Sequence, residues 1–295
     1  MGAAGRHIPK EPRAERKMRY IGSALKYMFK NFIFIFVFAL VPSYFFALTQ
    51  DAQNIEDLVR AFRPGAEGPE FSQLFNFFSP FNGRGWPYAL VCLASLAIIL
   101  PMLFGFIEKH MRIGSRTLRG LAGRFNTNFL TTLVLLVAGV AVYELWALIA
   151  AGLIFAETLI LGGAAFTVIA LVTYAGMMAL ACYLASAFLL WLPCQLITGY
   201  NFMDSLAYTN QLSVGHKGGL FLSVFLPAAA GLVVEVLTVW LCGMAELAAV
   251  IFIVTELLFL FFVLYISSLM FSAYFRLTGE ERMDLKKKYG QGGAA

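Results

Sequence analysis

Charge is scarce in this 295-residue sequence. Lys, Arg, Asp and Glu together make up 13% of it, against 60% hydrophobic residues that include 29 Phe. Soluble globular domains carry about 25% charged residues, roughly twice this share. The composition therefore excludes an ordinary soluble domain and predicts a protein of the lipid bilayer.

Reactive and metal-binding residues are also few, with 4 Cys and 3 His. Cys92, Cys182, Cys194 and Cys242 lie far apart, without the paired spacing of a disulfide framework or a zinc site. The sequence contains no phosphate-binding loop, no G-x-S-x-G elbow and no H-E-x-x-H motif. We therefore expect no enzyme activity, no metal site and no cofactor, and we interpret the His residues as isolated, solvated side chains.

Long apolar stretches dominate what remains, and six of them can cross a hydrocarbon core about 30 Å thick. They span residues 32–48, 87–108, 129–155, 164–197, 219–242 and 247–275. In the long block 129–197, only Glu157, Gly162 and Gly163 indicate a turn, which favours two long tilted helices. The predicted fold is all-α and polytopic: a membrane domain (20–275) between two basic tails (1–19 and 276–295).

The 22 Lys and Arg residues predict the orientation. Nineteen of them lie in the N-terminal segment, in residues 109–124, at Lys217 and in the C-terminal tail, whereas the loop 49–86 holds three. Basic residues concentrate in cytoplasmic connections, so both termini are predicted to be cytoplasmic. The first stretch lacks a small-residue cleavage site and is expected to stay as an anchor.

Two segments, 99–136 and 191–226, share an order of features: Leu-Pro, then Gly, then Ser, then about a dozen half-polar residues before a new apolar stretch. The N-terminus gives a shorter version. This order predicts three copies of one unit, a short interfacial helix followed by a helical hairpin. Ser23, Ser115 and Ser205 are the predicted N-caps. Chance similarity stays an alternative, above all for the first copy.

The short helix of the second copy is predicted to be amphipathic. Its apolar residues recur at helical spacing, and its basic residues fall on other faces. Such a helix lies in the membrane interface with its basic side chains near anionic lipid headgroups. These side chains are Arg116, Arg119 and Arg124. Membrane lipids are therefore expected partners, whereas nothing indicates a nucleic acid.

The loop 49–86, predicted to lie outside, contains the Phe-rich run "FSQLFNFFSPFNGRGWP". One interpretation is a lid or a ligand-contacting element over the bundle. The other is an interfacial belt in which Phe and Trp lie at the lipid boundary. The belt is the favoured interpretation.

Three acidic residues interrupt the apolar stretches: Glu144, Glu235 and Glu256. A charged side chain at such depth costs about 2.5–3.5 kcal/mol on insertion scales and therefore normally faces the bundle interior or water. Because no predicted span contains a basic residue, these carboxyl groups need other partners. We predict that all three share one interior region that serves transport. The alternative is neutral Glu side chains that tie helices together.

The stretches "RIGS" (112–115) and "RFNTNF" (124–129), with the echo "DSLAYTNQLSVGHKGG" (204–219), carry a resemblance. They resemble a loose group of uncharacterised prokaryotic six-span membrane proteins related to the membrane domain of glycerophosphoryl diester phosphodiesterases. The resemblance spans about residues 18–275. It implies an architecture in a prokaryotic plasma membrane and no activity, because no catalytic phosphodiesterase domain is present.

The leading functional prediction is a small-solute transporter or permease-like protein, with proton coupling through Glu144, Glu235 and Glu256 as one form of it. The main alternative is a non-catalytic accessory protein that supports assembly of a partner complex or senses lipid. A protein partner or a homo-oligomer fits either prediction. A membrane enzyme ranks third.

Overall fold

The computed structural model describes residues 13–50, 52–62, 68–81, 85–114, 116, 120–243 and 248–279. In these ranges the regular structure is helical and no strand occurs. Among the described residues, six helical spans are long and apolar enough to cross a bilayer. The predicted all-α fold class is therefore confirmed, and the chain is a multi-pass integral membrane protein.

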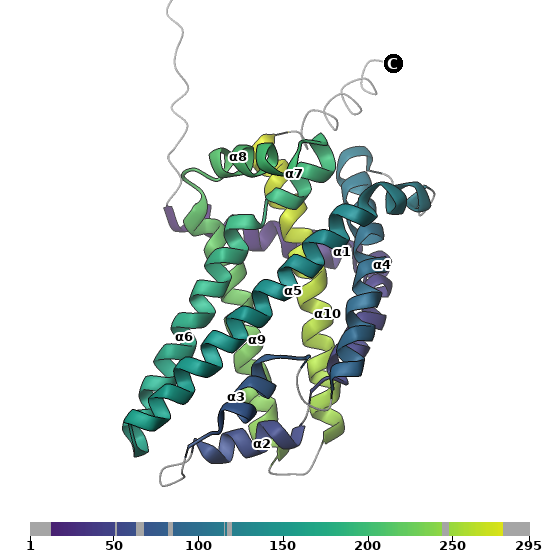
Figure 1. Cartoon of the computed structure of the whole chain (residues 1–295). Coiled ribbons are helices and arrows are strands. Elements are labelled where there is room, and N and C mark those ends of the chain that lie inside the picture. The colour runs from purple at the N-terminus through teal and green to yellow at the C-terminus, as the bar shows by residue number, and fades with distance from the viewer. Residues whose placement is uncertain are drawn as a thin grey trace, which may run out of the picture.

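The long helices are α1 (Arg13–Ala47), α4 (Trp86–Ile113), α5 (Leu121–Ile160), α6 (Gly163–Phe188), α9 (Lys217–Gly243) and α10 (Ala248–Thr278). Four shorter helices join them: α2 (Ala52–Ala61), α3 (Phe71–Phe78), α7 (Trp191–Thr198) and α8 (Phe202–Leu212). Figure 1 shows them in chain order from purple to yellow.

The long helices follow one another around a closed ring. The pairs α1–α4, α5–α6 and α9–α10 pack as three hairpins. Neighbouring hairpins meet through α4 and α5 and through α6 and α9, and α10 returns to α1. The predicted hairpins are therefore present, whereas an internal repeat stays a prediction.

The two ends of the ring differ (Figure 1). At one end, α4 finishes, α9 begins, and α7 and α8 lie. We call it the basic end. It carries most Lys and Arg side chains of the described helices: Lys26, Lys30, Lys109, Arg112, Lys217 and Arg276. The short helices α2 and α3 lie at the opposite end, called the capped end.

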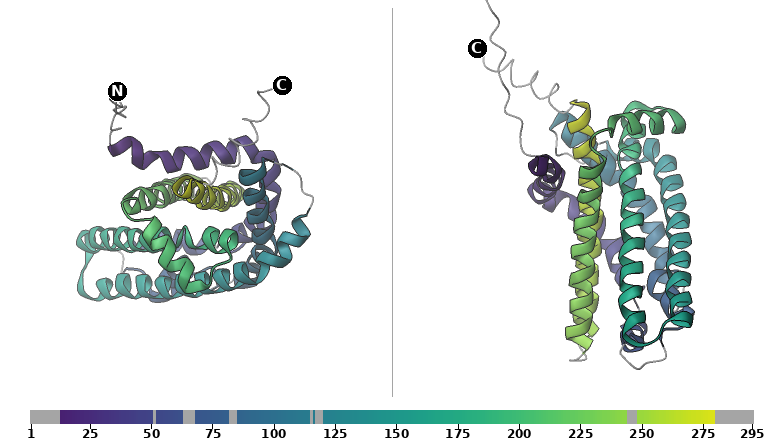
Figure 2. Two further views of the ribbon diagram at one scale, coloured as in Figure 1. Left: turned by 90° about the horizontal axis from the view of Figure 1, so that it is seen from above. Right: turned by 90° about the vertical axis from the view of Figure 1, so that its left-hand side faces the viewer.

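The predicted lead-in helices differ from those observed. In the first copy the lead-in is continuous with the span in α1, whose N-terminal part runs along the outer side of α9 and α10 near the basic end in Figure 2. Ser23 is inside α1 and donates to the Tyr20 carbonyl at 2.9 Å. Asn201, not Ser205, is the N-cap residue of α8. The N-cap prediction is therefore wrong for Ser23 and Ser205, and Ser115 lies outside the described residues.

The fourth predicted span, 164–197, is broken after Phe188, and α7 begins at Trp191. Pro193 explains the break, because its ring nitrogen has no hydrogen to donate to the Leu189 carbonyl one turn earlier. Proline is tolerated in the first turn of a helix, which is its place in α7.

Two hydrogen bonds tie the N-terminal part of α1 to the ring. The Tyr20 hydroxyl lies 2.8 Å from His216 Nδ1 at the start of α9, and the Tyr27 hydroxyl lies 2.9 Å from His110 Nδ1 near the end of α4. Neither His is therefore isolated as predicted, although the His216 side chain is exposed and His110 is half-buried. Their bonds fix the lead-in part of α1 to α4 and to the start of α9 at the basic end.

Candidate functional site

Two cavities are lined by residues that the structure describes. The first, called the neutral cavity, has a volume of about 550 Å³ and is lined by α1, α4, α5 and α10 together with the α2–α3 region. The second, called the carboxyl cavity, has a volume of about 760 Å³ and is lined by α1, α5, α6, α9 and α10. Ligand pockets in proteins typically measure about 300–1,000 Å³. Both volumes can therefore hold a small molecule.

The two cavities share Phe46, Tyr143 and Phe259 as wall residues. The rings of Phe46 and Phe259 stack with their centroids 4.0 Å apart. This pair joins α1 to α10 where the two cavities meet. Tyr143 reaches the same region from α5.

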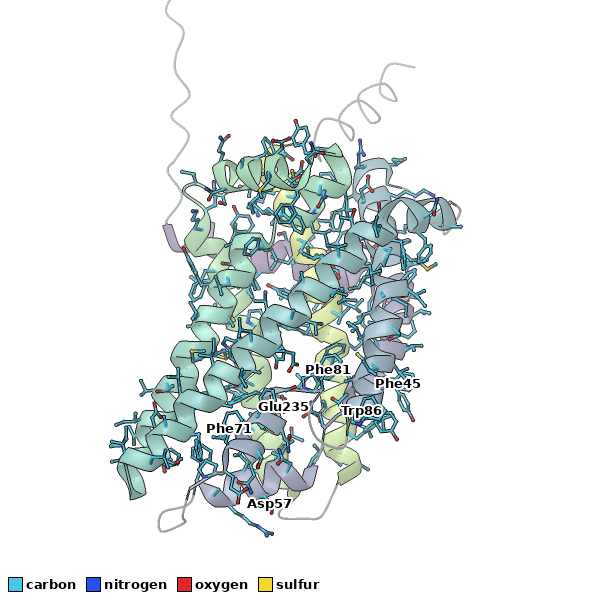
Figure 3. The ribbon with its side chains drawn as sticks, in the orientation of Figure 1. Phe45, Asp57, Phe71, Phe81, Trp86 and Glu235 are labelled. Atoms are coloured by element: carbon cyan, nitrogen blue, oxygen red, sulfur yellow. The ribbon has the colours of Figure 1, made fainter. Side chains whose placement is uncertain are left out.

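Glu235 is the only charged residue among the described residues that line the carboxyl cavity. It lies half-buried on α9, and Figure 3 labels it where α9 and α3 overlap in that view. Within the described ranges, no side chain or backbone group makes a hydrogen bond or an ion pair with its carboxyl group. That carboxyl group is therefore available to a proton, to water or to a ligand in the cavity.

Glu144, on α5, has a partner that the sequence did not suggest. The Ser79 hydroxyl donates to Glu144 Oε2 at 2.6 Å, and Glu144 Oε1 is buried with no partner among the described residues. The preceding residue, Tyr143, donates to the Phe78 carbonyl at 2.7 Å. Two consecutive residues of α5 therefore hold the end of α3.

Tyr143 connects the acidic residues of the interior. It precedes Glu144 on α5, and it lines the carboxyl cavity together with Tyr174 and Glu235. The structure thus gathers two of the three predicted carboxyl groups around one tyrosine.

Glu256 is not part of this group. It is half-buried on α10 and lines neither cavity, whereas the preceding residue, Thr255, lines the carboxyl cavity. Successive residues of an α-helix point about 100° apart, so Thr255 and Glu256 face different directions, and Thr255 is the one that lines this cavity.

A fourth interior carboxyl group belongs to Glu157, which the sequence suggested only as a turn marker. It lies inside α5 and accepts a hydrogen bond from the Thr173 hydroxyl of α6. Its second oxygen is buried without a partner among the described residues. Glu157 therefore ties the two helices of one hairpin together.

The Phe-rich segment covers the interior rather than forming a lipid belt. Phe78 stacks on Tyr174 at 5.6 Å and meets Trp146 edge-on at 5.8 Å. Leu74 is 1% exposed and packs in one cluster with small residues of α5 such as Ala147. The belt interpretation is therefore wrong for α3, because these side chains bury against α5 and α6.

Of the predicted lipid-contacting arginines, the structure describes one side chain. Arg116 is exposed, its guanidinium lies 5.8 Å from the centre of the Phe34 ring, and its Nε donates to His110 Nε2 at 3.3 Å. Arg119 lies outside the described residues, and only the backbone of Arg124 is described. Headgroup binding by these residues stays a prediction.

No protein-family model, no curated protein and no solved structure matches the chain. The candidate site therefore rests on this structure alone. The resemblance to six-span proteins related to phosphodiesterase membrane domains stays a prediction.

Proposed function

We propose that this protein is a permease-like transporter of a small solute in a prokaryotic plasma membrane, with both termini in the cytoplasm and Glu235 as its proton-binding group. One observation supports this proposal most directly. A carboxyl group without a hydrogen-bond partner among the described residues lines a cavity inside a ring of membrane-spanning helices.

A comparison with the other interior acids strengthens the argument. Glu144 and Glu157 each accept a hydrogen bond from a hydroxyl group of another segment, as expected of residues that hold a fold together. Glu235 has no such bond within the described ranges, although an ionisable group at this depth is costly. An intramembrane ionisable residue without such a bond is a candidate for a functional role.

A second candidate function has its own support. On α6, Ala175 and Gly176 are exposed, and a side-chain atom added at Gly176 would meet nothing within 4 Å. Small residues allow close approach of another helix in a membrane. This surface suits an accessory role in which α6 packs against a partner protein.

The transport proposal can be tested without knowing the solute. Proteoliposomes containing the protein are incubated with a small-molecule extract of bacterial cells, with or without an imposed pH gradient. Mass spectrometry then identifies the compounds retained inside. A gradient of one pH unit can drive about tenfold accumulation of a neutral solute per coupled proton, because 1.4 kcal/mol corresponds to a factor of ten.

The key variant is Glu235→Gln, which keeps the shape of the side chain and removes its titration. Glu157→Gln is the matched control, because it makes the same change in an acid that lines neither cavity. We expect gradient-driven accumulation by the unmodified protein and the control, and none by Glu235→Gln. The proposal is overturned if no compound accumulates, or if Glu235→Gln accumulates the same compounds to the same level.

A further inference from the structure

The neutral cavity has no charged side chain among the described residues that line it. Several of its polar members lie at the capped end, among them Asn54, Asn76 and Ser79, whereas Thr132 and Ser267 line its inner part. The middle of the cavity is apolar, with Leu96 of α4 and Val140 of α5 among its walls. The cavity thus has an uncharged polar mouth and an apolar body.

The cavity is long compared with its volume. Its wall on α4 extends from Ala89 to Phe104, which is about 22 Å at 1.5 Å per residue. A volume of 550 Å³ spread over this length leaves a narrow channel along the ring. Such a shape suits one extended chain better than a compact, rounded solute.

The inner part of the cavity offers a further hydrogen-bonding group. The Thr132 hydroxyl is buried, and it has no partner among the described residues. Thr132 also lines the cavity. A hydroxyl group can donate or accept, so it suits a hydroxyl or carbonyl oxygen of a bound molecule without requiring charge.

These features select the chemistry of an occupant. A charged molecule would lose its hydration here without meeting an opposite charge. A small and wholly polar molecule would lose hydration along the apolar body of the cavity. A hydrocarbon chain would gain from leaving water, and its polar group could be hydrogen-bonded at the capped end.

We propose that the neutral cavity binds an uncharged amphiphile, a single hydrocarbon chain that carries hydroxyl or carbonyl groups. The polar group lies against Asn54, Asn76 and Ser79, and the chain extends toward Phe104. That this molecule is also the transported solute rests on the proposed function, whereas its binding does not.

Gly139 offers a direct way to fill the cavity. It lies on α5 and lines the neutral cavity, and a Cβ atom added there would meet nothing within 4 Å. Gly139→Leu therefore places a side chain in the cavity without a clash at Cβ. Gly152→Leu is the matched control, since Gly152 lies on the same helix, also has no atom within 4 Å of an added Cβ, and lines neither cavity.

The experiment uses the purified full-length protein and native mass spectrometry with 1-monooleoylglycerol as the probe. Oleate, which has the same chain and a negative charge, is the chemical control. We expect one bound 1-monooleoylglycerol per chain and at least tenfold weaker binding of oleate. Gly139→Leu should weaken binding of 1-monooleoylglycerol at least tenfold, and Gly152→Leu should leave it unchanged. Equal binding of the two probes, or undiminished binding by Gly139→Leu, overturns the proposal.

The outcomes for this site and for transport are distinguishable. If 1-monooleoylglycerol binds as expected but no compound accumulates in proteoliposomes, the transport proposal fails and the binding site stands. If Glu235-dependent transport is observed but 1-monooleoylglycerol binds no better than oleate, the amphiphile site fails and transport stands.

Discussion

The hydrogen bond between Ser79 and Glu144 joins the capped end to the ring and should contribute measurably to stability. Ser79→Ala removes the 2.6 Å bond to Glu144 Oε2 and also the 3.2 Å bond from the Phe81 backbone to the serine hydroxyl. Hydrogen bonds to charged groups contribute about 1.5–3 kcal/mol in soluble proteins. Side-chain bonds between membrane helices average about 0.6 kcal/mol and reach about 1.7 kcal/mol.

The environment of Glu144 favours a contribution in the upper part of the range for side-chain hydrogen bonds between membrane helices. Ser79 is 1% exposed, and Glu144 Oε1 already has no partner among the described residues. Ser79→Ala would therefore leave the carboxyl group without a described hydrogen bond in a partly buried place. We expect a coupling energy between Ser79 and Glu144 of about 1–2 kcal/mol.

A double-mutant cycle measures this coupling. The free energy of unfolding in mixed detergent micelles is determined for the unmodified protein, Ser79→Ala, Glu144→Gln and the double variant, with tryptophan fluorescence as the signal. Ser186→Ala is the matched control, because the Ser186 hydroxyl donates to the Tyr183 carbonyl of its own helix. The effects of substitutions at two distant sites on the free energy of unfolding add to within about 0.3–0.5 kcal/mol. The stabilising role of the Ser79–Glu144 bond would be refuted if its coupling energy stayed within about 0.3–0.5 kcal/mol and did not exceed the coupling energy between Ser186 and Glu144.

Two further predictions follow from the capped end and from the topology. A Cβ atom at Gly85 would lie 2.4 Å from the Thr49 carbonyl oxygen, so Gly85→Ala should lower the free energy of unfolding by about 1–3 kcal/mol. Gly176→Ala is the control and should not lower it, because a Cβ atom there meets nothing within 4 Å. Equal effects of the two substitutions would contradict the steric explanation. In a cysteine-free background, Asp57→Cys on the exposed face of α2 should react with an impermeant thiol reagent added to intact cells, and Gly215→Cys should not. Labelling at Gly215 would reverse or refute the predicted orientation.

The sequence predicted the six spans and the three hairpins because those features depend on local properties. An apolar stretch of about 20 residues has few alternatives to a membrane-spanning helix. A short turn such as Gly162–Gly163 forces the next helix to return beside the last one. Element boundaries were less predictable, since α1 continues from its interfacial part into the membrane without a break.

The partners of the carboxyl groups could not be predicted, because they come from distant parts of the chain. Ser79 and Glu144 are 65 residues apart, and no periodicity relates a loop serine to a helix 65 residues later. A similar predicted depth in the membrane correctly indicated that Glu144 and Glu235 lie in the same part of the interior. It failed for Glu256, because depth alone does not determine which direction a helical residue faces.

The arrangement of the two cavities suggests how a proton and a solute can influence each other. Glu235 lies on the wall of the carboxyl cavity and the proposed amphiphile occupies the neutral cavity, so neither needs to touch the other. Tyr143 is in both walls and donates a hydrogen bond to the Phe78 carbonyl of α3. Glu235 thus shares a cavity wall with a residue that also shapes the neutral cavity and anchors the segment at its mouth. If both proposals hold, this shared wall is the physical route by which a ligand in one cavity and a proton in the other influence each other.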